Sequence, residues 1–154
     1  MNAVKILGVA GLIASLAFTT FKGDKDPLHK KKYTGQAIEI KDGKPTNKKP
    51  MPDEIEFKNG KVYSSHVWEK MEFQDVKYNI NKDSTYNDEG EEKHYYEVEA
   101  ITTNEKNETV NMFFIINGYD IEATYKLIKK DVVKKMYTST GKEKVKAKKG
   151  KEKE

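Results

Sequence analysis

The stretch that decides the fold runs from Val110 to Tyr125 and reads Val-Asn-Met-Phe-Phe-Ile-Ile-Asn-Gly-Tyr-Asp-Ile-Glu-Ala-Thr-Tyr. An Asn-Gly pair favours a two-residue turn whose central residues both have positive φ, so a turn is expected at Asn117-Gly118. Antiparallel pairing outward from this turn creates one wholly apolar face. The expected opposite pairs are Ile116 with Tyr119, Phe114 with Ile121, Met112 with Ala123, and Val110 with Tyr125. Turn chemistry and pattern agree, which predicts a β-hairpin.

A second hairpin is expected earlier in the chain, where residues 55–64 read Ile-Glu-Phe-Lys-Asn-Gly-Lys-Val-Tyr-Ser. A type I′ turn at Asn59-Gly60 sets Phe57 opposite Val62 on an apolar face. The two lysines that flank the turn then lie on the other face. This segment therefore predicts a second pair of strands with one buried side.

Shorter runs of alternating apolar residues predict the remaining strands, and they cover 33–40, 76–80, 96–100 and 132–140. Residues 41–53 contain three prolines and read as a long loop. The total is about eight antiparallel strands joined mostly by short turns. We therefore predict an all-β fold, an up-and-down barrel, with a β-sandwich as the alternative.

The chain opens with the three parts of a secretory signal, which are a basic start, a short apolar centre and small residues before a cut site. The apolar run is too short for a membrane-spanning helix, which takes about 20 residues. We expect a signal peptide over 1–17, with cleavage after Ala17 or as late as Thr20. A flexible lead-in over 18–32, a barrel domain over 33–141 and a disordered tail over 142–154 are expected to follow.

Charge and cysteine content exclude several classes of protein. The chain has no cysteine, so it is neither a lipoprotein nor stabilised by disulfides. All 29 basic residues are lysine, whereas arginine is the residue preferred for phosphate and base recognition. The tail holds seven lysines and three glutamates, so most of the net charge of +4 lies outside the expected barrel. This distribution disfavours a nucleic-acid partner, although the tail could contact an anionic envelope surface.

No residue pattern indicates catalysis, a metal or a cofactor. The three histidines, His29, His66 and His94, are far apart in sequence, and there is no Gly-x-Ser-x-Gly elbow. Residues 83–92 concentrate carboxylates in an expected loop, which either binds calcium or is a solvated acidic turn. The absence of EF-hand spacing favours the acidic turn. We therefore predict a protein that is not an enzyme and holds no cofactor.

Several segments together resemble small exported lipocalin-like proteins of Bacteroidota-type bacteria. They are Gly35 in the first strand, 52–65, the strand 73–78, Ile121 to Tyr125, and the terminal Tyr-Thr-Ser-Thr-Gly of 137–141. The chain departs from true lipocalins in having Tyr33-Thr34-Gly35 where these carry Gly-x-Trp. The resemblance implies a calycin-like barrel and, by analogy, a binding role.

An open barrel would give the large apolar residues a binding function, whereas a closed barrel would make them core. The expected ligand-binding residues are Phe57, Val62, Trp68, Met112, Phe114, Tyr119 and Tyr125. The sequence thus predicts a periplasmic or secreted protein that binds a small apolar ligand inside a β-barrel. The alternative is a filled barrel that serves as a structural or interaction module of the cell envelope.

Overall fold

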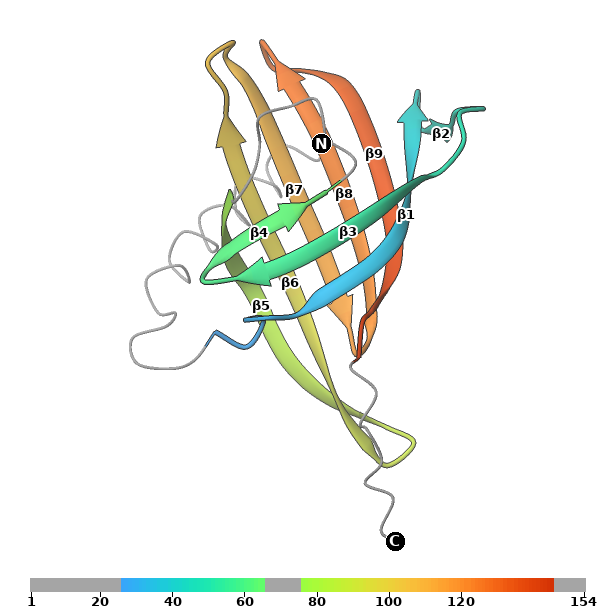
Figure 1. Ribbon diagram of the computed structural model, residues 1–154, viewed down its shortest axis with the longest axis vertical. Coiled ribbons are helices and arrows are strands. Elements are labelled where there is room, and N and C mark those ends of the chain that lie inside the picture. Colours follow the sequence, from blue (N-terminus) through green and yellow to red (C-terminus); the bar gives the residue numbers. More distant parts are fainter. Residues whose placement is uncertain (1–25, 66–75, 146–154) are drawn as a thin grey trace, which may run out of the picture.

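The computed structural model describes residues 26–65 and 76–145, and within them every regular element is a β-strand (Figure 1). The strands are β1 (Lys32–Lys41), β2 (Lys44–Pro45), β3 (Met51–Lys58), β4 (Lys61–Ser64), β5 (Val76–Asp88), β6 (Glu91–Thr103), β7 (Glu108–Asn117), β8 (Asp120–Lys129) and β9 (Val132–Glu143).

The strands form one closed antiparallel sheet. Apart from the short β2, each strand pairs with its neighbours in chain order, and β1 also pairs with β9, which joins the two ends of the sheet. Closure removes the free edges that a sandwich would retain. The predicted all-β, barrel-like fold is therefore confirmed.

The first hairpin has the predicted register. Lys58 lies opposite Lys61, and Phe57 lies opposite Val62. Asn59 and Gly60 have φ values of 53° and 74°, as a type I′ turn requires. Local turn chemistry therefore accounts for this hairpin.

The second hairpin has a different register from the predicted one. Asn117 is the last residue of β7 and lies opposite Asp120, so the turn residues are Gly118 and Tyr119. Gly118 alone has a positive φ, 61°, as in a type II′ turn with glycine first. The pairing moves by two residues, which keeps the same face of each strand inward. Only the turn residue Tyr119 loses its expected place on the apolar face.

A pair of glycines lies at the seam between β1 and β9. Gly35 lies opposite Gly141, and a Cβ added to either would come within 2.4 Å of a backbone oxygen of the other strand. Side chains are excluded at this point because the two backbones approach so closely. The glycine pair therefore constrains the register in which the barrel can close.

Aromatic rings fill one level of the barrel interior. Phe57 packs edge-to-face against three rings, with centroid separations of 6.1 Å to Tyr33, 5.2 Å to Tyr78 and 5.4 Å to Phe114. Such pairs are favourable beyond the apolar area that they bury. Interior-facing residues of every strand except β2 join this core.

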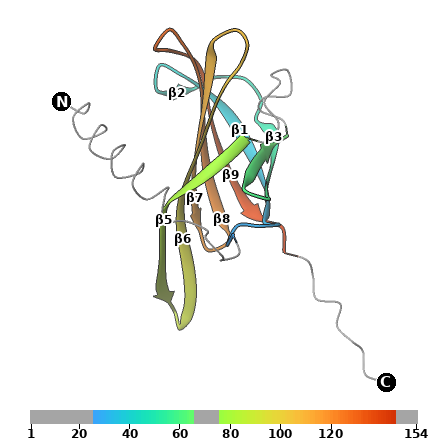
Figure 2. The same ribbon diagram turned by 90° about the vertical axis from the view of Figure 1, so that its left-hand side faces the viewer.

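Strands β5 and β6 extend together beyond the end of the barrel, as both views show (Figures 1 and 2). The pairing of β6 with β7 ends where Tyr95 meets Asn117, so residues 91–94 continue past the last residue of β7. The segment 83–92, expected to be a loop, instead forms the ends of these strands and a turn at Glu89-Gly90. Alternation is weak there because the two-stranded extension has no core to face.

Three other segments are more ordered than the sequence suggested. Part of the expected lead-in, residues 26–31, forms a turn that buries Leu28 completely. It is held by backbone bonds between Lys30 and Phe57 and between Phe57 and Lys31. The expected loop 41–53 contains a tight turn and β2, and β3 already begins at Met51. Strand β9 also runs two residues into the expected tail, to Glu143.

Candidate functional site

Five of the seven predicted ligand-binding residues face the barrel interior. Their exposed fractions lie between 0 and 2 %, and they are Phe57, Val62, Met112, Phe114 and Tyr125. A side chain with so little accessible surface borders no void that could hold more than a water molecule. A ligand placed among these five residues would have to displace their side chains. Their packing is that of a core.

The other two predicted residues are placed differently. Tyr119 is 61 % exposed in the turn between β7 and β8, so the expectation that it faces the interior is wrong. The reason is the two-residue shift of the hairpin register. Trp68 lies outside the described residues.

A buried polar cluster, which the sequence analysis did not identify, lies inside the barrel. Asp53 on β3 is 1 % exposed and accepts two hydrogen bonds. Ser64 Oγ donates to Asp53 Oδ1 at 2.7 Å, and Tyr125 Oη donates to Asp53 Oδ2 at 2.7 Å. Strands β9 and β1 separate β8 from β3 in the ring, so the Tyr125 side chain reaches across the interior. The cluster thus ties opposite parts of the wall together.

Burial, followed by the nearby Asp53 carboxylate, raises the pKa of Tyr125 well above its ordinary value. Burial, followed by Glu143, likewise raises the pKa of Tyr33. An ordinary phenol is already protonated at neutral pH, and the raised pKa extends the protonated range of both phenols further into alkaline pH. Tyr33 Oη and Ser139 Oγ are buried hydroxyls with no hydrogen-bond partner among residues 26–65 and 76–145, an arrangement uncommon in protein interiors.

A groove of about 360 Å³ lies on the outer surface where the β5–β6 extension meets the β7–β8 turn. We call it the end groove. Its lining residues come from β5, β6, the β7–β8 turn and its flanking residues, and β9, and they are Tyr86, Asp88, Lys93, Asn117, Gly118, Tyr119, Asp120 and Lys142.

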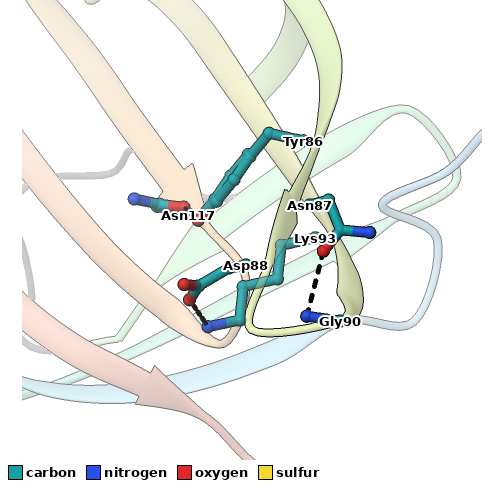
Figure 3. Close-up of polar contacts among 6 residues, drawn as sticks. All are labelled: Tyr86, Asn87, Asp88, Gly90, Lys93 and Asn117. Atoms are coloured by element: carbon teal, nitrogen blue, oxygen red, sulfur yellow. Dashed lines mark hydrogen bonds and ion pairs between the residues drawn. The ribbon is translucent and has the colours of Figure 1, made fainter.

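Side-chain contacts fix the wall of the end groove (Figure 3). Tyr86 Oη donates to Asn117 Oδ1, which links the extension to the end of β7. Lys93 forms an ion pair with Asp88 across the same extension. At the tip, Gly90 N–H donates to Asn87 Oδ1 at 3.0 Å. The Tyr86–Asn117 bond holds the extension against the barrel end, and the other two contacts lie within the extension itself.

Tyr119 is exposed although its backbone is anchored on both sides. Gly118 N–H donates to the carbonyl of His94 at 2.9 Å, and Glu143 N–H donates to the carbonyl of Tyr119 at 2.7 Å. Because the backbone of the turn is already fixed, the turn loses little conformational entropy when a partner binds to the exposed ring. Exposed aromatic residues on rigid frames are characteristic of binding surfaces.

A second groove of about 530 Å³ continues from the end groove across the outer face of the sheet. The two share Asp120 and Lys142. The second reaches Glu122 on β8, Thr140 on β9, and Thr34 and Gln36 on β1. Together they form an elongated surface lined largely by hydroxyl, amide and carboxylate groups.

Among residues 26–65 and 76–145, no three histidine or carboxylate side chains are grouped so that they could hold a metal ion. No helix in these same ranges is long and apolar enough to cross a membrane.

Comparison of the chain with protein-family models, curated proteins and solved structures finds no match in any of the three. The function has to be argued from the sites themselves.

Sequence reasoning missed the two polar features of the molecule. Asp53 falls in the expected loop 41–53, yet its alternation with Ile55 and Phe57 could have placed it on the inner face. The end groove had no comparable signal. It depends on how far β5 and β6 extend past the end of β7, which no local pattern specifies.

Proposed function

We propose that the protein is an exported, non-enzymatic binding module whose packed barrel presents a partner-binding surface at the end groove. The observation that carries this proposal is Tyr119, a ring 61 % exposed on a turn whose backbone is held on both sides. The buried rings around Phe57 support the same view, because a packed interior leaves the outer surface for recognition.

Export rests on the signal-peptide pattern of residues 1–17. An exported module in the periplasm or outside the cell meets the polymers of the cell envelope first. The proposed function is therefore attachment to, or recognition of, an envelope component.

Cosedimentation with an insoluble envelope fraction of the producing cell tests this function. The mature protein, beginning at Phe18, should sediment with the envelope, and Tyr119→Ala should reduce the bound fraction about tenfold or more. Ile101→Ala is the matched control, because Ile101 is 53 % exposed on β6 and does not line the groove. Absence of envelope binding by the unaltered protein, or equal binding by both variants, would contradict the proposal.

The Lys-rich tail offers a competing explanation for envelope binding. Each lysine near an anionic surface contributes about 1 kcal/mol. Lys144 already contacts Glu54 at 3.0 Å, so the truncation should remove only residues 146–154. Binding that disappears with this truncation and persists in Tyr119→Ala would assign the function to the tail instead of the groove.

A small apolar ligand inside the barrel is the second candidate function. It requires the packed interior to open, and it would then give a partner to the buried hydroxyls of Tyr33 and Ser139, which have none among the described residues. Native mass spectrometry of protein recovered from its own envelope fraction should then show extra mass that is released on denaturation. Phe114→Asp should abolish that retention. An apo mass for the recovered protein would reject this candidate.

A further inference from the structure

The end groove and its continuation suggest the class of partner, and this inference rests on the proposed surface-binding function. The two grooves meet at Asp120 and Lys142 and extend from β5 round to β1. A continuous surface that crosses several strands suits a linear polymer better than a compact small molecule. We propose that it binds a polysaccharide chain that is neutral or nearly so.

The first support is the combination of aromatic and polar groups. Tyr119 and Tyr86 are 61 % and 39 % exposed. The apolar face of a pyranose ring packs on an aromatic ring, while its hydroxyls need donors and acceptors at the edge. Asn117, Asp120 and Thr140 supply such groups along the surface.

The second support is charge. The surface carries two lysines and three carboxylates, and one of each is already paired, Lys93 with Asp88. The remaining charges are Lys142, Asp120 and Glu122. Such a surface lacks the excess of positive charge that a nucleic acid or a polyanion requires. A neutral ligand rich in hydroxyls fits it better.

The third support comes from the backbone. The continuation lies on the face of a sheet where β8 and β9 are paired with each other, β7 pairs with β8, and β1 pairs with β9. An extended peptide gains affinity by adding a strand to a free sheet edge. On a face of paired strands the backbone groups are already engaged in the pairing between strands, which favours a saccharide over a peptide.

Asn117, where the β5–β6 extension contacts the end of β7, has a specific role in this arrangement. Its Oδ1 accepts the bond from Tyr86, which orients the amide so that its two N–H donors face away from Tyr86. Asn117→Asp retains the acceptor and removes these donors. It should therefore weaken saccharide binding while the extension stays in place.

The test uses two treatments of the same envelope fraction. Periodate cleaves the vicinal diols of saccharides, and proteinase K removes protein. Sedimentation of the mature protein should be lost after periodate and retained after protease treatment. Soluble cellohexaose, maltohexaose and xylohexaose, whose residues all carry the 2,3-diol that periodate cleaves, are then titrated calorimetrically to identify the sugar. Tyr119→Ala should weaken the binding about tenfold or more, and Ile101→Ala should leave it unchanged.

The outcomes separate this inference from the proposed function. Tyr119-dependent binding that survives periodate and is lost after protease would overturn the polysaccharide and keep the surface-binding function, with a protein partner. Failure of the protein to sediment with any envelope fraction would overturn the function. Binding of an oligosaccharide that is equal in Tyr119→Ala and the unaltered protein would overturn the assignment to this groove.

Discussion

Two hairpins of this barrel contain the same dipeptide, Asn-Gly, and use it differently. In the first, Asn59 and Gly60 are both turn residues with positive φ. In the second, Asn117 closes β7 and the turn consists of Gly118 and Tyr119. Local chemistry alone favours the first arrangement in both places.

The difference shows how closure of the sheet selects a register. Strand β7 pairs with β6 on one side, and β8 pairs with β9 on the other, while β9 must meet β1 at the glycine pair. A shift of two residues between β7 and β8 would have to be absorbed elsewhere in the ring, because strand number and stagger are linked in a closed barrel. The type II′ turn gives β7 and β8 a register that fits the closed barrel. This register places Tyr119 at the surface.

The largest loss of stability is expected for a substitution of the core residue in the first hairpin. Phe57→Ala should lower the free energy of unfolding by about 3–5 kcal/mol, because it removes a ring that packs on three others. Urea denaturation measures it, and Phe57→Leu, which keeps most of the volume, should cost clearly less. A loss below about 1 kcal/mol would show that the interior at this level is not packed.

The next test concerns the glycine pair between β1 and β9, which constrains the register of the closed barrel. Gly141→Ala should cost about 1–3 kcal/mol, because the added Cβ would lie 2.4 Å from a backbone oxygen of β1. Ser139→Ala on the same strand is the control, and it should change stability by less than about 0.5 kcal/mol since its hydroxyl has no partner. Equal effects of the two changes would remove the glycine pair as a determinant of register.

The two asparagines allow a direct comparison of the hairpins. Asn59→Ala should cost about 1 kcal/mol, because alanine is disfavoured in the left-handed region that Asn59 adopts. In a Tyr86→Phe background, which already lacks the hydrogen bond to Asn117, Asn117→Ala should cost less than about 0.5 kcal/mol, because Asn117 ends a strand. Thermal unfolding of both variants measures the contrast. Equal losses would indicate that Asn117 is also a turn residue.

The smallest change in stability is expected for the exposed residue Tyr119. Tyr119→Ala should change the free energy of unfolding by less than about 0.5 kcal/mol, because the ring is 61 % exposed. The same urea denaturation measures it. A loss of about 2 kcal/mol or more would place Tyr119 in the core, as the register read from the sequence predicts.

Alternation along the chain is enough to predict the buried face of the strands that line the core. Alternation placed Phe57, Val62, Met112, Phe114 and Tyr125 inside, and the two-residue register shift did not disturb them. It did so because side-chain direction has a period of two and depends only on the neighbouring residues. The first turn was readable for a similar reason, since Asn59 and Gly60 determine it locally.

The assembled barrel sets the register of the second hairpin, the polar cluster at Asp53 and the end groove. Each depends on strands far apart in the chain. Tyr125 meets Asp53 across the barrel, and Tyr86 meets Asn117 because β5 and β6 extend past β7. Ring closure sets these distances, and it is a property of all the strands together.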